Sequence, residues 1–497
     1  RAGIDTFGFG GVNFHAVLEE APEADISKGI RFIGYAQEIS LPAELLIFRA
    51  PTRQALIHLL DDTRTTLATP GSIGLQKIAE RLRKEISLTG PTLAVVTKSI
   101  EECVLHLTKA LKLLHDGFRL EFLMAQGIYF SEIPLKENEK IAFLFPGFGS
   151  QYLNMGGDLS LHFSFVNDIF RNVDEVARRH IGGSILKVLT SGETSSSEKE
   201  ANLNDLLMRP DYNHAAMTAL GMGIFEVMER AGVRPDMTAG HSLGEYLALY
   251  AAGVFDMETT VRVMLARGEG ITRHCFQNGA MASIGVPAEE LTGVLKEAGG
   301  FVAIANKNCP AQTVVSGHMD AVTQVMVRME KKGIPCRRLS IAFASHTPLL
   351  ADCAEPFREF LDTVTISCPR IPVQSNLTGR KYEVDERFAD TLRDSLSKHL
   401  TQPVEFISNI LSLYEEGARF FIEIGPGSTL SSFVDNILAD KPHWTVVTNL
   451  PKRSATLQLL HALAFCAAKG LAVNLSNILP ERRTCGGSSL EPRELPL

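Results

Sequence analysis

The sequence predicts an α/β protein with a doubly wound core, a second unit inserted into that core, and a small α/β domain ahead of both. Short apolar runs of strand length alternate with helical patterns through most of the chain. Residues 279–342 form a self-contained set of strands and helices within that alternation. At 497 residues, the chain is also too long for one ordinary hydrophobic core, so we expect about two to four folded units.

The composition excludes several classes of function. Apolar residues make up 45% of the chain and charged residues 21%, which is typical of a folded protein. The net charge of −8 comes from interspersed acids and bases, so no nucleic-acid partner is expected. No apolar run is long enough to span a membrane, and no signal-peptide pattern is present, so no membrane partner is expected. The eight cysteines include no Cys-x-x-Cys pair, which indicates buried thiols in a reducing, cytoplasmic setting and no metal site.

The first 136 residues contain a short fragment and a small domain. Residues 1–22 are rich in glycine and then alternate into a strand, but they are too few to fold alone. Because they look like mid-domain sequence, we expect the chain to be a piece of something larger. Residues 23–136 have the pattern of a small α/β domain in which no reactive side chains converge. Its strands are predicted at Glu44–Phe48, Thr92–Thr97 and Ile128–Phe130, and its helices at Arg53–Leu60, Gly74–Lys84 and Ile100–His115.

A larger α/β domain is predicted from about residue 137 to residue 450. Ile141–Phe145 is an apolar strand that leads into Pro146-Gly-Phe-Gly-Ser-Gln151. A glycine-rich turn after a parallel strand commonly binds phosphate or an oxyanion through its backbone N–H groups. This turn lacks both the Gly-x-Gly-x-x-Gly spacing and the Lys-Ser/Thr of a P-loop, so a nucleotide site is disfavoured.

The most informative stretch is a serine framed by glycines between a short strand and a helix. Met237–Ala239 leads into Gly240-His-Ser-Leu-Gly244, and a helical pattern follows as far as Gly253, where a helix is expected to stop. Gly-x-Ser-x-Gly at such a turn is a nucleophile elbow, in which glycines permit a sharp bend and the serine hydroxyl stays accessible. Ser242 is therefore the predicted nucleophile, and the core is predicted to be hydrolase-like.

Residues 279–342 are predicted to form an inserted subdomain with the element order β-α-β-β-α-β. Its strands are predicted at Met281–Val286, Phe301–Ala305, Thr313–Ser316 and Cys336–Ile341, and its helices at Ala288–Ala298 and Ala321–Lys331. This order is typical of the ferredoxin-like fold. A ligand is expected in the crevice between subdomain and core. Residues 451–497, with one helix at Leu457–Ala468, are interpreted as a linker that wraps around the domain.

A serine nucleophile needs a base within hydrogen-bond reach, and two histidines are candidates. His241 directly precedes Ser242, and in an elbow its side chain points away from that of the serine. His346 lies where the chain leaves the inserted subdomain, beside the expected crevice. We favour His346 as the base, with a buried structural histidine as the alternative.

Arg267 lies on the apolar stripe of a helix predicted at Met257–Gly268. A buried arginine costs on the order of several kcal/mol unless a carboxylate meets it. That carboxylate is either an internal Asp or Glu, or it belongs to a substrate that the guanidinium holds through two hydrogen bonds.

Two groups of motifs resemble known families. The larger group consists of Pro146-Gly-Phe-Gly-Ser-Gln151, Gly240-His-Ser-Leu-Gly-Glu-Tyr246, Arg267, Ser345-His346, Pro403-Val-Glu-Phe406 and Glu423-Ile-Gly-Pro-Gly427. Together, over residues 140–450, they resemble malonyl-CoA:acyl-carrier-protein acyltransferases, which occur alone or within type I polyketide and fatty acid synthases. Ahead of them, residues 8–15 resemble the C-terminal signature of a ketosynthase, in which His15 would be one of two condensing histidines. The other ketosynthase residues are absent, so no condensation is predicted.

The resemblance implies an organisation for the whole chain. Residues 1–22 would be a ketosynthase tail and 23–136 the ketosynthase–acyltransferase linker domain. Residues 137–450 would be the acyltransferase domain, and 451–497 a linker that follows it. The chain is thus similar to part of an iterative type I synthase of the polyketide or polyunsaturated-fatty-acid kind.

The resemblance also implies a role for each matching residue of the centre. Ser242 would carry the acyl group, and His346 would be its general base and acid. The backbone carbonyl of His399 would orient His346. The backbone N–H groups of Phe148 and Leu243 would hold the oxyanion.

Around this centre, Arg267 would bind the free carboxylate of a malonyl group. Further pocket residues implied by the resemblance are Gln151, His241, Asn306, Asn308, Phe343 and Ser345. The chain departs from the family at Phe148, where glutamine is usual, and at Asn213-His-Ala215, where Gln-Pro-Ala is usual. Leu243 favours malonyl, whereas Phe343-Ala-Ser-His346 is closer to the Tyr-Ala-Ser-His form of methylmalonyl enzymes. We interpret the combination as favouring malonyl.

These residues predict a ping-pong transacylase. Malonyl-CoA would acylate Ser242, and the malonyl group would pass to the phosphopantetheine thiol of an acyl carrier protein. The expected partners are that carrier protein and the ketosynthase and other domains of the same synthase, with no bound cofactor. Two alternatives are a patatin-like or other serine hydrolase or thioesterase, which predicts an aspartate partner for the serine, and a docking scaffold, which predicts no acylation of Ser242.

Overall fold

The computed structural model describes residues 2–7, 13–18, 41–69, 74–84, 90–116, 123–191, 197–274, 278–341 and 343–479. The chain divides into two compact units, one of Arg1–Ile39 with Glu481–Leu497 and one of Ser40–Pro480. In the smaller unit, β1 (Ala2–Phe7) pairs antiparallel with β2 (Asn13–Leu18). The side chain of His15, which the sequence singles out, lies outside the described residues. Within the described ranges, no helix has both the length and the apolar character needed to cross a membrane.

The larger unit begins with a three-stranded antiparallel sheet in the order β3-β4-β5. Its elements are β3 (Glu44–Arg49), α1 (Arg53–Ala68), α2 (Leu75–Lys84), β4 (Thr92–Thr97), α3 (Ile100–Asp116) and β5 (Ile128–Ser131). Alternate residues of the strands face opposite sides. Leu46 and Val95 pack with helices α1 to α3, whereas Leu45 and Val96 belong to the large core that continues into the rest of the unit. This sheet is therefore buried on both faces.

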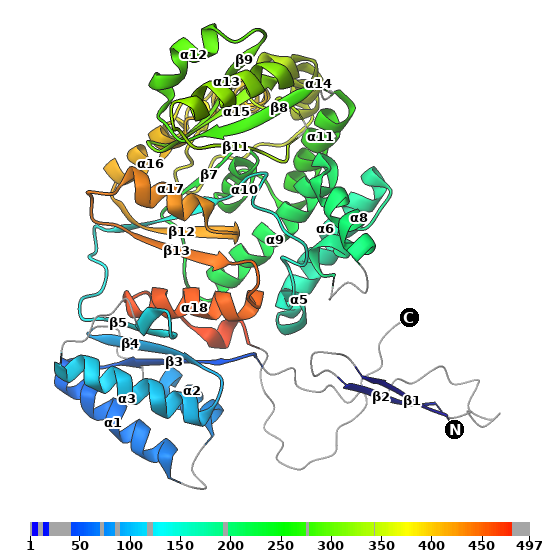
Figure 1. Cartoon of the computed structure of the whole chain (residues 1–497). Helices are drawn as coiled ribbons and strands as arrows, with labels where there is room; N and C mark the ends of the chain where they lie inside the picture. The colour runs from blue at the N-terminus through cyan, green and yellow to red at the C-terminus, as the bar shows by residue number, and fades with distance from the viewer. Residues whose placement is uncertain are drawn as a thin grey trace. The chain divides into compact units, whose positions relative to one another are not determined.

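A parallel sheet in the order β13-β12-β6-β7 forms the centre of the larger unit (Figure 1). Its strands are β6 (Lys140–Phe145), β7 (Met237–Gly240), β12 (Ala418–Pro426) and β13 (Trp444–Asn449). Phe143 and Phe145 face one apolar cluster, and Ala142 and Leu144 face another. Helices thus cover both faces, as a sheet of near-continuous apolar strands requires.

Most helices of the unit surround this sheet. They are α5 (Leu159–His162), α6 (Ser164–Ile181), α7 (Leu186–Leu189), α8 (Ser197–Met208), α9 (Pro210–Arg230), α10 (Gly244–Ala251), α11 (Met257–His274), η3 (Pro348–Leu350), α14 (Ala351–Asp362), α15 (Phe388–Lys398), α16 (Phe406–Glu415), α17 (Thr429–Ile437), α18 (Ala455–Ala468) and η4 (Leu475–Asn477). Helices α9 and α11 pack against one another and bring their buried residues toward the carboxyl edge of β7.

An antiparallel sheet in the order β11-β8-β10-β9 lies between α11 and α14 in the chain. Its elements are β8 (Gly279–Ile284), η2 (Ala288–Leu291), α12 (Thr292–Lys296), β9 (Val302–Cys309), β10 (Gln312–His318), α13 (Met319–Lys331) and β11 (Cys336–Arg338). Ala282, Val315 and Val325 lie in its own small apolar core.

Several element boundaries differ from the sequence prediction. The strand predicted at Cys336–Ile341 ends at Arg338; the Leu339 N–H still donates to the Met281 carbonyl at 2.9 Å, and Leu339 and Ile341 line a cavity. The helix predicted at Arg53–Leu60 continues to Ala68, where buried Leu67 extends its apolar stripe. These boundaries depend on tertiary packing more than on local propensity.

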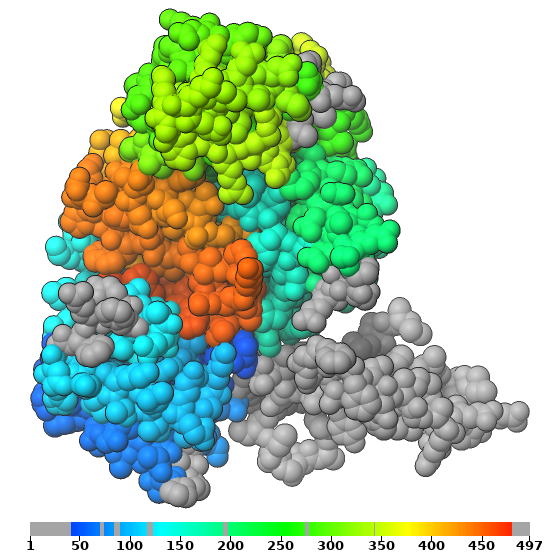
Figure 2. Space-filling model, in the orientation of Figure 1, coloured from blue at the N-terminus to red at the C-terminus, as the bar shows by residue number. Residues whose placement is uncertain are grey.

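Helix α18 connects two of the three sheets described in the larger unit (Figure 1). It packs on β3, β4 and β5 on one side and on β13 on the other. Buried Arg49 donates from Nη2 to the Ala467 carbonyl at 3.0 Å, and the Tyr129 hydroxyl lies 2.9 Å from His461 Nδ1. Little of this helix, drawn red, reaches the face seen in Figure 2. Most residues of α18, which lies in the stretch predicted to be a wrapping linker, are buried.

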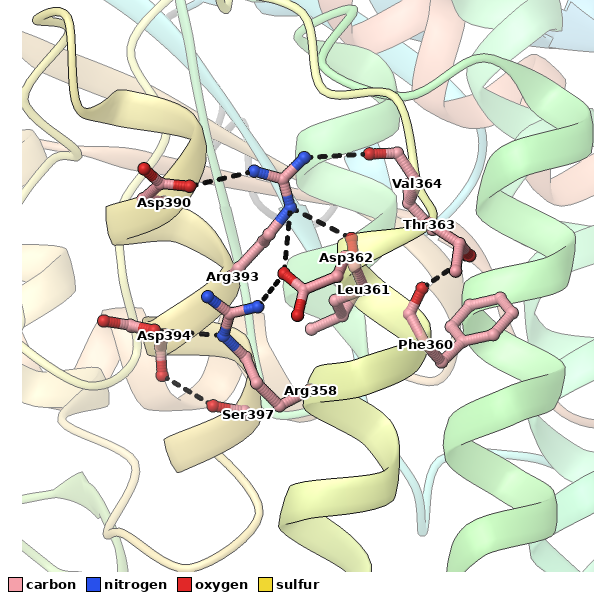
Figure 3. Close-up of polar contacts among 10 residues, drawn as sticks. All are labelled: Arg358, Phe360, Leu361, Asp362, Thr363, Val364, Asp390, Arg393, Asp394 and Ser397. Carbon is pink, nitrogen blue, oxygen red and sulfur yellow. Dashed lines mark hydrogen bonds and ion pairs between the residues drawn. The ribbon is translucent and has the colours of Figure 1, made fainter.

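A polar network ties α14 to α15 (Figure 3). Arg358 donates from Nε to Asp394 at 3.0 Å and forms an ion pair with Asp362. Arg393 donates to the carbonyls of Leu361 and Val364 at 3.0 and 3.1 Å, where α14 ends. Because the last carbonyls of a helix lack partners within it, Arg393 acts as a C-terminal cap. The network therefore fixes α14 relative to α15.

Candidate active site

Ser242 lies on a sharp turn between β7 and α10. Its φ of 52° is in the left-handed region, which is rarely adopted by a residue with a side chain. The flanking glycines make the turn possible by close approach: a Cβ on Gly240 would lie 2.0 Å from the Gly244 carbonyl carbon, and one on Gly244 would lie 1.9 Å from the Phe145 carbonyl oxygen. The result is the strand–turn–helix geometry that the sequence pattern predicts.

Ser242 and His346 are in direct contact. The distance from Ser242 Oγ to His346 Nε2 is 2.8 Å, and His346 Nδ1 lies 2.9 Å from the backbone carbonyl oxygen of His399. Because a carbonyl can only accept, Nδ1 carries the proton of the neutral ring, and Nε2 accepts from the serine hydroxyl. His346 precedes α14, and His399 directly follows α15. The network of Figure 3 therefore links the two helices that position His346 and the His399 carbonyl.

His346 is held in its neutral form. Burial and, to a smaller extent, the nearby positive charge of Arg267 lower its pKa to about 3. A neutral imidazole can accept the serine proton. No carboxylate contacts Nδ1 of His346 within the described residues, in contrast to the arrangement that a serine hydrolase with an aspartate partner predicts.

Arg267 of α11 is buried beside the same serine. Its side chain is 3% exposed, and its Nη2 lies 3.4 Å from Ser242 Oγ. Nη1 contacts His214 Nε2, and Nε has no hydrogen-bond partner in the described part of the chain. No acidic side chain in that part forms an ion pair with the guanidinium. Arg267 is thus a buried cation without an ion pair in that part; its guanidinium lies over the Tyr246 ring, 5.6 Å from the ring centre, and burial lowers its pKa.

The loop after β6 lies opposite the elbow. A Cβ on Gly147 would lie 2.4 Å from the His241 carbonyl oxygen, so glycine is required for the loop to approach this closely. Within the described residues, the backbone N–H groups of Phe148 and Leu243 donate to no other group. The Phe148 ring packs edge-on against Phe343, with ring centres 5.8 Å apart.

A cavity of about 500 Å³ brings the predicted site residues together. It lies between the parallel sheet and the antiparallel sheet, with Met281, Val314 and Leu339 contributed by the latter. Its lining includes Phe148, Gln151, His241, Ser242, Arg267, Asn306, Asn308, Phe343, Ser345 and His346. Leu243 and His399 are buried behind the lining, where the His399 carbonyl oxygen meets His346.

The remaining predicted pocket residues are held by hydrogen bonds. His241 Nε2 lies 2.7 Å from Asn308 Oδ1, and Asn308 Nδ2 donates to Gln312 at 2.8 Å. The Gln151 side chain accepts from the Gly149 N–H at 2.6 Å. Asn306 lies on β9, beside Asn308 in the same cavity wall.

Sequence reasoning missed the residue that holds the elbow. Asn376 accepts from the Ser242 N–H at 2.7 Å and donates to the Gly240 carbonyl at 2.6 Å. Its own N–H donates to Glu245 at 3.1 Å, and Tyr382 donates to the same carboxyl group. Burial raises the pKa of Glu245 to about 7. The polar run Gln374-Ser-Asn376 after an apolar segment is the signal that could have revealed it.

His214 was also missed as part of the site. It lies on α9, is fully buried, and contacts Arg267. The sequence marked this position only as a departure from the family pattern. A histidine in the largely apolar stretch Asn213–Ile224 is the signal that was available.

Comparison with known proteins decides the family. The family described as "Acyl transferase domain" matches residues 142–471. The chain belongs to this family. Malonyl CoA-acyl carrier protein transacylase of Bacillus subtilis is 34% identical over 307 residues, which are 60% of this chain and 90% of that protein. The resemblance that the sequence motifs predicted is therefore confirmed, and acyl transfer is the activity of the domain.

A longer relative covers nearly the whole chain. This relative, a polyunsaturated fatty acid synthase polypeptide of Thraustochytrium sp., is 25% identical over 493 residues, 95% of this chain. The chain spans only 17% of that synthase. Among solved structures, the acyl transferase domain of SpnD, in complex with 2-(pent-4-yn-1-yl)malonyl, matches with a TM-score of 0.72 and 27% identity, covering 89% of this chain and 98% of that one. This match confirms the predicted mixed α/β fold.

Proposed function

We propose that this acyltransferase loads a malonyl group from malonyl-CoA onto the phosphopantetheine thiol of an acyl carrier protein, through an ester on Ser242. The observation that carries the proposal is Arg267, a buried guanidinium that forms no ion pair with any carboxylate among the described residues, beside Ser242 in one cavity. A substrate carboxylate would supply the missing partner through charge-assisted hydrogen bonds. The name of the Bacillus subtilis relative supports the same donor and acceptor.

In the first half-reaction, Ser242 Oγ attacks the thioester carbonyl carbon while its proton passes to His346 Nε2. The N–H groups of Phe148 and Leu243 stabilise the oxyanion, and the His399 carbonyl stabilises the protonated imidazole. The carbon–sulfur bond breaks, and the departing CoA sulfur takes the proton from His346. The Ser242 malonyl ester remains.

In the second half-reaction, the carrier-protein thiol gives its proton to His346 and attacks the ester carbonyl. The carbon–oxygen bond breaks, and His346 returns the proton to Ser242. Throughout, Arg267 holds the malonyl carboxylate. Of the two extenders considered, we propose malonyl rather than methylmalonyl, on the basis of Leu243 after the serine.

We also propose the organisation of the chain. Residues 1–22 would be a ketosynthase tail, 23–136 a linker domain, 137–450 the acyltransferase with subdomain 279–342, and 451–497 a following linker. The order β11-β8-β10-β9 supports a ferredoxin-like subdomain, and the elbow on a parallel sheet supports a hydrolase-like core. The match to a much longer synthase polypeptide supports a ketosynthase and further domains as neighbours.

The experiment is intact-protein mass spectrometry after brief incubation with malonyl-CoA, methylmalonyl-CoA or acetyl-CoA. We expect a malonyl adduct on the wild type and none on Ser242→Ala. Arg267→Ala should lose malonyl loading by about 100-fold or more, because a charged hydrogen-bonded pair is removed, and should favour acetyl-CoA relative to the wild type.

Other outcomes would contradict the proposal. Free CoA released without an adduct would point to hydrolysis, and no reaction with any donor would point to a docking scaffold. If Arg267→Ala kept its preference for malonyl, the carboxylate would be bound elsewhere.

A further inference from the structure

The contact between Arg267 and His214 joins two residues that are both fully enclosed. His214 lies on α9 and Arg267 on α11, and these helices approach closely at this point. A Cβ on Gly268 would lie 2.9 Å from the Pro210 carbonyl oxygen, so no side chain can separate the helices there. The two helices are therefore held close together where the imidazole meets the guanidinium.

The imidazole accepts from the guanidinium. Arginine has only donors, so His214 Nε2 must be the acceptor for Arg267 Nη1. Burial and then the charge of Arg267 lower the pKa of His214 well below its usual value, so the ring is neutral. One end of the guanidinium is thus anchored by a group that carries no charge.

A second contact steadies the imidazole. The Phe148 ring lies against His214 with ring centres 6.3 Å apart, and Phe148 packs in turn on Phe343. Three rings in series therefore form a wall of the cavity next to Arg267. Phe148 and His214 occupy the two places where the sequence departs from the family pattern.

A neutral anchor differs from an acidic one in its effect on a ligand. A carboxylate at position 214 would orient Arg267 equally well, but it would also neutralise the charge that attracts a substrate acid. An apolar side chain would leave the charge but not the orientation. Only an uncharged acceptor fixes the guanidinium and leaves its charge available.

We propose that His214 is a positioning residue that orients Arg267 without neutralising it and thereby sets the selectivity of this acyltransferase for acyl groups that bear a carboxylate. This inference rests on the proposed function of Arg267. It assigns His214 no contact with the reacting atoms.

Three variants of the full chain separate the elements of this proposal. His214→Leu removes the acceptor at similar volume, His214→Gln keeps a neutral acceptor, and His214→Glu supplies a charged one. For each we would measure kcat and KM for acylation by malonyl-CoA and by acetyl-CoA, together with the thermal midpoint of unfolding.

We expect His214→Leu to raise the KM for malonyl-CoA by about 10- to 100-fold, the value of a hydrogen bond to a charged group, with a much smaller change for acetyl-CoA. His214→Gln should restore most of the malonyl preference. His214→Glu should lower malonyl acylation by about 100-fold and acetyl acylation much less, because the internal ion pair competes only with an acid.

The proposal is overturned if His214→Leu keeps the wild-type KM for malonyl-CoA, or if His214→Glu keeps the wild-type preference. It is also overturned if His214→Gln and His214→Leu lose malonyl acylation to the same extent. If His214→Leu does not fold, the malonyl preferences of His214→Gln and His214→Glu test the proposal, because both side chains keep an acceptor and differ in charge. A wild type that prefers acetyl-CoA would instead contradict the proposed function itself.

Discussion

At the scale of single residues, the candidate site depends on the charge states of two buried groups. His346 is neutral because it is buried beside a cation, and Arg267 forms no ion pair within the described residues. Burying either side chain costs free energy unless its polar atoms find partners. Both suit a reaction in which a base must accept a proton and a cation must receive an anionic ligand.

The pH dependence of acylation follows from His346. Its folded pKa of about 3 lies below the unfolded value of about 6.5, so between these pH values the unfolded chain binds the proton and the folded chain does not. Stability is therefore lost as the pH falls below about 6.5, while the base stays neutral. We expect the rate of Ser242 acylation to show no decline from His346 near pH 6.5, and acid inactivation to coincide with unfolding followed by circular dichroism.

A second buried group beside the elbow can titrate in that range. Because burial raises the pKa of Glu245 to about 7, Glu245→Gln is the matched control. If the rate of Ser242 acylation also declined reversibly near pH 6.5 in folded Glu245→Gln protein, His346 would have an ordinary pKa and the prediction would be wrong.

At the scale of elements, the strand–turn–helix of the elbow depends on a side chain from a distant segment. Thr238 of β7 forms an isolated parallel bridge with Val373, and Asn376 follows three residues later. Its amide spans the turn from the Gly240 carbonyl to the Ser242 N–H. Two backbone groups that the sharp bend leaves unpaired are satisfied in this way.

Replacement of Asn376 by alanine should therefore weaken the elbow. Two buried backbone groups lose their partners, each at a cost of about 1–3 kcal/mol, so we expect the free energy of unfolding to fall by about 2–5 kcal/mol. The Ser242 acylation rate should fall as well, since the turn that presents Oγ is no longer held. Urea denaturation and rapid-quench mass spectrometry would measure the two effects.

Asn204→Ala is the control, because Asn204 is exposed on α8 and its amide contacts only the Glu200 carbonyl of its own helix. If Asn376→Ala were as stable as that control, the two hydrogen bonds would not be what holds the turn.

At the scale of the whole molecule, α18 makes the larger unit continuous. Its residues pack on both the β3-β4-β5 sheet and the parallel sheet, and most of them are buried. The apolar cluster that contains Leu45 and Val96 also contains Leu463 and Phe420. A core shared in this way predicts one cooperative unfolding transition for residues 40–480.

Leu463→Ala tests this continuity. The side chain is fully buried, so we expect a loss of about 2–5 kcal/mol. Trp444 is the single tryptophan of the chain and lies on β13, with Lys469 Nζ 4.4 Å from its ring centre. Its fluorescence should report the same lowered midpoint as far-UV circular dichroism.

Leu161→Ala, at a side chain that is 63% exposed, should leave both midpoints unchanged. If fluorescence and circular dichroism showed two separate transitions, and Leu463→Ala shifted only the fluorescence transition, the β3-β4-β5 sheet and the parallel sheet would unfold independently.

The sequence by itself determined the elbow, the family and the order of the elements. Gly240 and Gly244 indicate a sharp turn, because a Cβ at either position would obstruct it. The motifs are specific because they follow one another in a fixed order and each adjoins a predicted strand or helix. It also predicted that Arg267 would be buried, because helical periodicity shows which face a residue occupies.

Only the tertiary structure decided what meets these residues. Asn376 is 134 residues from Ser242, and His214 is 53 residues from Arg267, so neither contact has a local pattern. The same holds for α18: the sequence predicted a helix there without predicting which two sheets it joins. Hydrogen-bond partners and shared cores depend on how distant segments are brought together, and one sequence encodes that only through the complete fold.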